Sequence, residues 1–327
     1  MFDSLKYHLK NASDAILYSD DKNFQNVAIT FLYNELDEAS QQSLIESQKD
    51  TETPEGFCLA PSEAANCMLD TNRTVKFVRG LVGAIEEAQN RNPGERISIL
   101  YAGCGPFATL SLPVTAIFTP DDIGFTVLDI HEASIQNAKR IIRLLGLRNY
   151  FDEYVCQNAL DYFATHQEKK FDVIITETMA SALFDEPQAA ITTKAAPLLK
   201  KNGIFVPERI VIGVKLKVYK AVNADDFGHI PVGDIFTLTK DTKPDSFSPR
   251  LRANFEIPPG LEDDLPFSIV LNTKIKVFGP HVLDEGEAGI TRPVTLKRKY
   301  QKRDGSKFHI SYPLGGDPKE LRIRVVE

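Results

Sequence analysis

Two glutamates, Glu177 and Glu186, lie nine positions apart in the segment TETMASALFDE, directly after the apolar run FDVIIT at residues 171–176. Such a run predicts a strand, and open α/β sheets place ligand contacts at the C-terminal ends of their strands. Two carboxylates on the loop that follows can hold one planar cation from two sides, as a guanidinium requires. We therefore interpret both glutamates as catalytic and substrate-binding residues, although Glu186 alone is also typical of a helix start before Pro187.

A glycine-rich segment, AGCGPFA at residues 102–108, follows a predicted strand and precedes a predicted helix. Gly103 and Gly105 let the backbone approach a ligand closely at the start of that helix, or merely permit tight strand–helix packing. Asp129 ends the next predicted strand, where a carboxylate can accept both hydroxyls of a ribose. These residues predict a site for an adenosine-containing cofactor, and because the glycine spacing also fits the dinucleotide fingerprint, NAD stays open.

For three further polar residues, the sequence alone allows a common structural role that competes with any role in binding. Asn158, after the third predicted strand, either reaches an adenine amino group or caps the next helix. Arg73 lies in the first turn of a predicted helix capped by Asp70, which is the common situation of a surface arginine. His131 follows the acidic strand end, and a lone histidine there is usually an exposed loop residue.

The elements that must position these residues alternate between strands and helices. Strands are predicted at 97–102, 125–130, 150–156, 171–176 and 203–207, with helices at 108–118, 132–146, 159–166 and 187–201. This alternation predicts an α/β fold with a doubly wound, Rossmann-like sheet. Helical patterns at 24–47 and 72–90, separated by a turn-rich break at 53–62, precede it, and short β-branched runs follow Pro207.

Three domains are expected from this change of pattern. Residues 1–90 form a helical N-terminal cap, residues 91–207 form the cofactor-binding domain, and residues 208–327 form an antiparallel β-barrel or sandwich that serves as a substrate domain.

Bulk composition narrows the class of protein. The chain has 327 residues and a net charge of −7, which argues against a nucleic-acid partner. No run of 18 or more apolar residues occurs and the N-terminus is charged, so we expect no membrane contact and a cytoplasmic location. The four cysteines lack paired spacing, so no metal site is predicted.

Several segments, in order, resemble the class I S-adenosylmethionine-dependent methyltransferases, and within them the protein arginine methyltransferase branch. They are MLDTNRTVKFVRGLVGAI (68–85), ILYAGCGPF (99–107), VLDI (127–130), TETMASALFDE (176–186) and PLLKKNGIFVPERIVI (197–212). The resemblance implies S-adenosylmethionine as cofactor, with Arg73 at its carboxylate and Asp129 at its ribose. It also implies that Glu177 and Glu186 grip the group that receives the methyl.

One departure from that family bears on the acceptor. Thr291, Arg292 and Pro293 stand where the family places a Thr-His-Trp loop. A fixed cation there can pair with the carboxylate of a free amino acid, so we interpret Arg292 as substrate-binding. We therefore expect an N-methyltransferase acting on a guanidino or amino group of a small, arginine-like molecule. A protein arginine acceptor, a catalytically inactive cofactor-binding scaffold, an NAD-dependent oxidoreductase and assembly as a homodimer all stay open.

Overall fold

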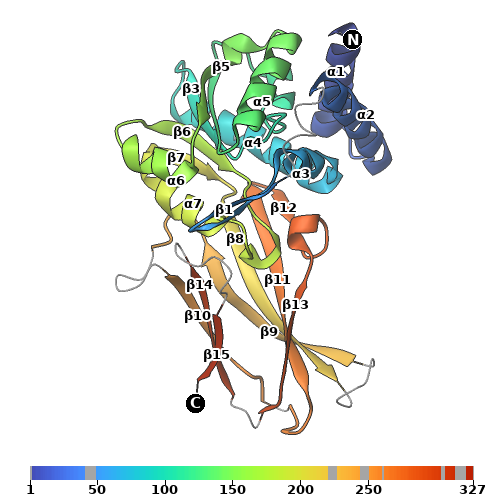
Figure 1. Ribbon diagram of the computed structural model, residues 1–327, viewed down its shortest axis with the longest axis vertical. Coiled ribbons are helices and arrows are strands. Elements are labelled where there is room, and N and C mark those ends of the chain that lie inside the picture. Colours follow the sequence, from blue (N-terminus) through green and yellow to red (C-terminus); the bar gives the residue numbers. More distant parts are fainter. Residues whose placement is uncertain are drawn as a thin grey trace.

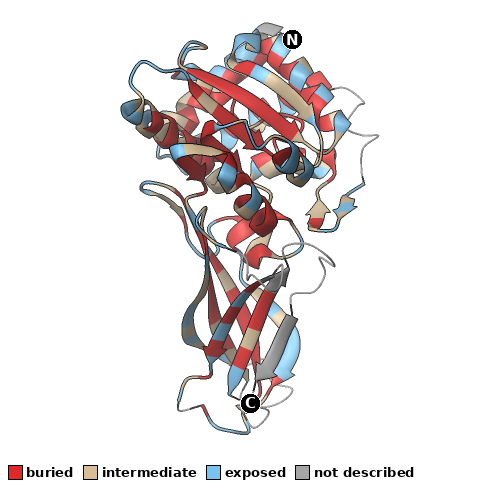
Figure 2. Cartoon of the chain, turned by 90° about the vertical axis from the view of Figure 1, so that its left-hand side faces the viewer, coloured by how far each residue is buried: buried red, intermediate tan, exposed pale blue. Residues whose placement is uncertain are grey.

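The computed structural model describes residues 2–40, 49–219, 227–243, 250–259, 261–302, 306–313 and 322–326. Its strands form two lobes along the long axis of the molecule (Figure 1). The upper lobe holds a parallel sheet with its helices, and the lower lobe holds antiparallel strands. Buried residues run through the sheet and continue into the strands below it (Figure 2). The predicted α/β fold with an antiparallel C-terminal part is confirmed.

The parallel sheet has five strands in the order β5-β4-β3-β6-β7. Their bounds are β3 Ile97–Ala102, β4 Ile123–Asp129, β5 Phe151–Cys156, β6 Phe171–Thr176 and β7 Leu199–Val206. The strand order reverses between β3 and β6, whose last residues, Ala102 and Thr176, are direct partners in the sheet. In open α/β sheets, ligands bind outside the carboxyl ends of the strands at this switch point.

The helix predicted at 187–201 is too long: it ends at Ala195 before Pro197, and residues 199–201 belong to strand β7. Otherwise the helices cover the sheet largely where the sequence predicts them, with one exception. They are α4 Thr71–Arg91, α5 Glu132–Leu145, α6 Ala159–Thr165 and α7 Gln188–Ala195, with single turns at η4 Arg148–Tyr150, η5 Ser181–Leu183 and η6 Ala196–Leu198. The helix predicted at 108–118 is wrong: that segment consists of turns and the short 3-10 helix η3, Pro113–Ala116. Ala108 has a φ of 48°, and Pro113 has no amide hydrogen to continue an α-helix. The glycine loop therefore does not lead into a helix N-terminus.

The N-terminal segment forms a helical pair and a small hairpin. It comprises α1 Phe2–Tyr18, α2 Lys22–Ser40, β1 Thr51–Thr53, β2 Gly56–Cys58, α3 Pro61–Asn66 and η2 Cys67–Leu69. Ile16, Ile29 and Leu32 are fully or almost fully buried and belong to the same hydrophobic core as the sheet. The segment therefore shares the core of the upper lobe, as a cap does. The last residues of the helix predicted at 24–47 lie outside the described residues.

The lower lobe consists of two antiparallel sheets. One has the order β12-β11-β8-β9 with β13 paired to β11, and the other has the order β10-β14-β15. The bounds are β8 Arg209–Tyr219, β9 Phe227–Leu238, β10 Arg250–Glu256, β11 Phe267–Phe278, β12 His281–Leu283, η7 Gly289–Thr291, β13 Val294–Tyr300, β14 Lys307–Pro313 and β15 Arg322–Val326. Phe308 stacks on Phe255 and contacts Phe267 and Tyr300 edge-on, so aromatic rings join the two sheets.

Helix α4 connects the two lobes. A Cβ atom at Gly80 would lie 2.5 Å from the side chain of Val277 in β11, so α4 packs on this strand at a distance that only glycine allows. At the start of α4, Asp70 accepts the amide hydrogen of Arg73 at 3.2 Å and that of Gly289 in the lower lobe at 2.6 Å.

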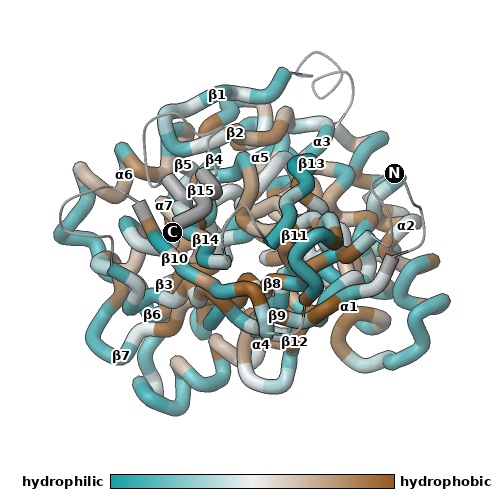
Figure 3. The backbone as a smooth tube through the Cα atoms, turned by 90° about the horizontal axis from the view of Figure 1, so that it is seen from below, coloured by the Kyte–Doolittle hydropathy of each residue, from teal (hydrophilic) through white to brown (hydrophobic). Residues whose placement is uncertain are grey.

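When the molecule is seen from below, the strands of the lower lobe lie near the middle of the view and the β1–β2 hairpin lies at its edge (Figure 3). No helix among the described residues is long and apolar enough to cross a membrane.

Candidate active site

A deep pocket opens at the carboxyl ends of β3, β4 and β6, where the strand order reverses. Its empty space is about 1060 Å³, counting the open solvent at its mouth. Seven of the eight predicted site residues line it: Arg73, Gly103, Gly105, Asp129, Asn158, Glu177 and Glu186. The eighth, Arg292, is not part of its lining.

The glycine loop forms one wall of the pocket with its backbone. Gly103 and Gly105 have φ angles of 75° and 63°, a region that favours glycine. A Cβ atom at Gly103 would lie 2.4 Å from the methyl carbon of Thr178. The loop is fixed by the Gly103 amide, which donates to the carbonyl oxygen of Leu128 at 2.8 Å. Glycine at 103 is therefore required both by the positive φ and by the close contact with Thr178.

Asp129 is held at the end of β4 by two backbone amides. Gly105 donates to Oδ2 at 3.0 Å, and His131 donates to Oδ1 at 2.9 Å. The side chain is 10% exposed. A carboxylate has about four acceptor positions, so two remain for the hydroxyl groups of a ribose. Its geometry suits the predicted role.

Asn158 begins α6 on the opposite wall. Its Oδ1 accepts the amide hydrogen of Leu160 at 2.9 Å, so the side chain caps the helix. The capping interpretation is confirmed. The side-chain amide group still lines the pocket, where its two hydrogens can be donated to a ligand.

The loop that carries the two glutamates has an unusual backbone. Ala182, Leu183 and Asp185 all have φ angles near +60°, at 57°, 56° and 61°. Non-glycine residues in this region cost free energy and persist only where the surroundings hold them. Here the Ala182 amide donates to Thr273 Oγ1 of β11 at 2.8 Å, and Ser181 Oγ donates to the Gly289 carbonyl at 2.8 Å. The lower lobe therefore holds the loop in shape.

Glu177 and Arg73 form an ion pair inside the pocket. Arg73 Nη2 donates to Glu177 Oε2, and the two side chains are only 13% and 10% exposed. The other oxygen, Glu177 Oε1, is buried and has no hydrogen-bond partner among the described residues. A buried carboxylate oxygen is costly without a donor, so its position suits a water or a ligand that donates a hydrogen bond.

Glu186 has an altered acidity. Burial raises the pKa of its carboxyl to about 7; the charge of Arg73 opposes the rise, while the carboxylates of Asp185 and Asp50 add to it. A carboxyl group with this pKa exchanges its proton near neutral pH, which is the property of a general base.

A second recess adjoins the pocket and shares Arg73 and Glu186 with it. Its lining is otherwise made by the glutamate loop and the 289–294 segment: Met179, Ala180, Ser181, Phe184, Asp185, Gly289, Ile290 and Val294. Arg292 is exposed and is absent from this lining as well. The recess therefore reaches Arg73 and Glu186 from the side of the glutamate loop and the 289–294 segment.

The sequence analysis missed several residues of the pocket. Thr53, Phe57 and Cys58 come from the β1–β2 hairpin, which the sequence presented only as a turn-rich break. His131, interpreted as an exposed loop residue, is only 13% exposed, and its Nε2 lies 2.9 Å from Thr51 Oγ1. The one signal in the sequence was Gly56 after Pro54, a pair typical of a tight turn. Within the described part of the chain, no His, Cys, Asp and Glu side chains cluster closely enough to hold a metal ion.

Comparison with known proteins identifies the chemistry of this domain. Residues 95–246 match the protein family described as a methyltransferase domain. A search of curated proteins gives no match. Among solved structures, the chain is similar to the Trypanosoma brucei PRMT1 enzyme-prozyme heterotetrameric complex with AdoHcy, with a TM-score of 0.51 and 13% sequence identity over 76% of this chain and 86% of that chain.

The methyltransferase prediction is confirmed for the domain that residues 95–246 match, and the chain shares the fold of the PRMT1 complex. That solved complex contains AdoHcy, the demethylated form of the predicted cofactor. The NAD-dependent interpretation, which rested on the glycine loop alone, explains neither the family match nor the glutamate loop.

Proposed function

We propose that this methyltransferase transfers a methyl group to a nitrogen of a guanidino or amino group, with Glu177 and Glu186 as the residues that hold the acceptor. One observation carries the proposal: the buried Oε1 of Glu177 lacks a hydrogen-bond donor in a pocket that Glu186 also lines. A cationic N–H group supplies such a donor, and a carboxylate pair matches its charge.

The residues of the pocket fit the cofactor. Gly103, Gly105 and Asp129 would hold its adenosine part, and Arg73 would hold its carboxylate. A guanidinium has five N–H donors, so Arg73 can serve a second carboxylate while it stays paired with Glu177. When bound, S-adenosylmethionine supplies an activated methyl group to the acceptor nitrogen.

Glu177 and Glu186 would prepare that nitrogen. A guanidinium cannot lose its proton in water near neutral pH, and its lone pairs are delocalised. Hydrogen bonds to one carboxylate draw positive charge toward the nitrogens they touch and orient the acceptor. The methylated nitrogen must release a proton, and Glu186, with its pKa raised to about 7, is suited to take it.

The size of the acceptor is a separate question. The sequence argument for a small, arginine-like molecule rested on Arg292, which lies outside the lining of both recesses. The proposal therefore specifies the reacting group, and the small molecule and the protein side chain are the two outcomes of one experiment.

That experiment uses labelled S-adenosylmethionine with the full-length enzyme. One reaction receives a small-metabolite pool and the other receives a cell protein extract. Label transferred to nitrogen in either reaction, and lost with Glu177→Gln, supports the proposal. Transfer only to oxygen or sulfur would contradict it, and cofactor binding without transfer to any acceptor would favour the inactive scaffold.

A thermal-shift measurement checks the cofactor independently. S-adenosylmethionine should raise the melting temperature and NAD should not, because a ligand that binds the native state stabilises it by mass action. A shift with NAD alone would overturn the assignment.

A further inference from the structure

The β1–β2 hairpin spans the pocket between the predicted ribose-binding acid and the glutamate loop. At one end, Thr51 Oγ1 and His131 Nε2 share a hydrogen bond of 2.9 Å. The His131 amide in turn donates to Asp129 Oδ1 at 2.9 Å, and its ring Nδ1 lies 3.4 Å from the same oxygen. Asp129 is thus connected to the first residue of the hairpin through one histidine.

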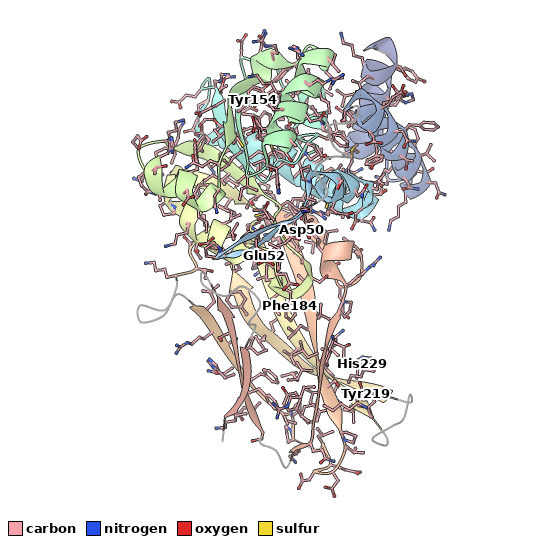
Figure 4. The ribbon with its side chains drawn as sticks, viewed as in Figure 1. Asp50, Glu52, Tyr154, Phe184, Tyr219 and His229 are labelled. Atoms are coloured by element: carbon pink, nitrogen blue, oxygen red, sulfur yellow. The ribbon has the colours of Figure 1, made fainter. Side chains whose placement is uncertain are left out.

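At its other end the hairpin is packed on the backbone beside Glu186. The Phe57 amide donates to the Asp185 carbonyl oxygen at 2.7 Å. Gly56 has a φ of 152°, and a Cβ atom there would lie 2.4 Å from that same oxygen. Any movement of the hairpin tip therefore displaces the residue that precedes Glu186. Figure 4 shows Asp50 and Glu52 of this segment above Phe184 of the glutamate loop.

The hairpin is able to transmit a displacement because its own shape is fixed. Thr51 pairs with Cys58 and Thr53 pairs with Gly56 in its two strands. Thr53 Oγ1 donates to the Gly56 carbonyl at 2.9 Å, and the Ala60 amide donates to Asp50 Oδ1 at 2.8 Å at the base. Asp129, His131, Thr51, Phe57 and Asp185 thus form a continuous chain of contacts.

We propose that Thr51 and His131 are positioning residues that couple cofactor binding at Asp129 to the placement of Glu186. The inference rests on the proposed function for the identity of the two ligand sites. A ribose bound to Asp129 fixes this carboxylate and therefore His131, the hairpin and the backbone at Asp185. Because coupling between two sites is reciprocal, an acceptor held at Glu186 strengthens cofactor binding by the same factor.

Hydrogen exchange of the full-length protein tests this coupling without knowledge of the acceptor. The probe is S-adenosylhomocysteine, the demethylated product of the cofactor, and the segments measured are 51–60 and 180–191. In the wild type, the probe should slow exchange in both segments. Thr51→Ser keeps the hydroxyl group and should behave like the wild type.

Thr51→Val has nearly the same shape but loses the hydrogen bond to His131. It should still bind the probe, about two- to tenfold more weakly, and the slowing in 180–191 should disappear. His131→Leu, whose side chain has no hydrogen-bonding group, removes the same bond from the side of His131 and should give the same result. Equal slowing in 180–191 for Thr51→Val and wild type would overturn the coupling.

Failure of this inference is distinguishable from failure of the proposed function. A wild type that binds the probe but shows no change in segment 180–191 refutes the coupling and leaves the methyltransferase proposal intact. A wild type that does not bind the probe refutes the cofactor site, and both proposals with it.

Discussion

The cofactor half and the acceptor half of the pocket satisfy their polar groups differently. Asp129 and Asn158, in the cofactor half, use hydrogen bonds to backbone amides of their own or adjacent loops. In the acceptor half, Glu177 keeps a buried oxygen without a partner, and burial raises the pKa of Glu186 to about 7. The backbone thus fixes the two side chains proposed to bind the cofactor, whereas in the proposed acceptor half a ligand would supply the donor that Glu177 Oε1 lacks among the described residues.

The largest expected effect comes from removing a carboxylate in the acceptor half. Glu186→Gln should lower turnover by about 10²–10⁴-fold, because the variant keeps the shape but has no base to take the proton. Glu177→Gln should also lose most turnover. S-adenosylhomocysteine binding, measured by calorimetry, should stay within a few-fold of wild type for Glu186→Gln.

Glu153→Gln is the matched control, since Glu153 pairs with Lys169 on the exposed side of β5. It should leave turnover unchanged. If Glu177→Gln and Glu186→Gln both retained wild-type turnover with the true acceptor, the two carboxylates would not hold or deprotonate the acceptor.

The second effect concerns stability and pH. Folding raises the pKa of Glu186 to about 7 from its ordinary value of 4.5, so the folded protein favours the protonated carboxyl. This preference adds to the free energy of unfolding in full below pH 4.5, and the added stability is lost as the pH rises through 7. Glu186→Gln should therefore equal wild type in unfolding free energy near pH 4 and exceed it near pH 9 by on the order of 3 kcal/mol. Denaturant unfolding at the two pH values measures this, and parallel pH curves would contradict it.

The third effect tests the cofactor half. Asp129→Ala should weaken S-adenosylhomocysteine binding by on the order of 1–3 kcal/mol, because the ribose loses its acceptor. Asp152→Ala, at an exposed ion pair with Arg96, is the control and should bind like wild type. Calorimetry compares the two, and equal affinities would show that Asp129 is not part of the cofactor site.

The smallest effect tests how the lower lobe supports the acceptor half. Thr273→Val removes the acceptor of the Ala182 amide. It should raise the activation free energy by about 1 kcal/mol, which lowers turnover roughly fivefold, and it should leave cofactor binding unchanged. Thr295→Val, at an exposed position on β13, should have no effect. If Thr273→Val changed cofactor affinity and left turnover unchanged, the lower lobe would support the cofactor half and not the acceptor half.

The residues proposed for the cofactor half could be selected from the sequence because each lies at a strand end or a helix start that the pattern marks. Gly103, Gly105 and Asp129 follow strands whose apolar runs are explicit, and Asn158 shows its capping role by its position before α6. The failure at 108–118 is also local. Apolar periodicity predicted a helix there, but Pro113 and the positive φ of Ala108 allow only turns and one 3-10 helix.

The acceptor half depends on contacts between distant parts of the chain. Arg73 meets Glu177 across 104 positions, and Ala182 meets Thr273 across 91. Neither periodicity nor spacing carries this information. The paired glutamates were found only because both lie on one short loop, and Arg292, placed by analogy with a loop of another sequence, was expected beside them without such a constraint.

The close packing of Gly80 on Val277 restricts how this enzyme can diverge. Since α4 carries Arg73 at its start and lies against β11 in its middle, the lower lobe cannot be exchanged for another barrel without a matching change in the helix that reaches the cofactor site. Substitutions confined to the loops at 179–186 and 289–294 change the recess without disturbing this contact, so they are the simpler route by which such a protein could acquire a new acceptor.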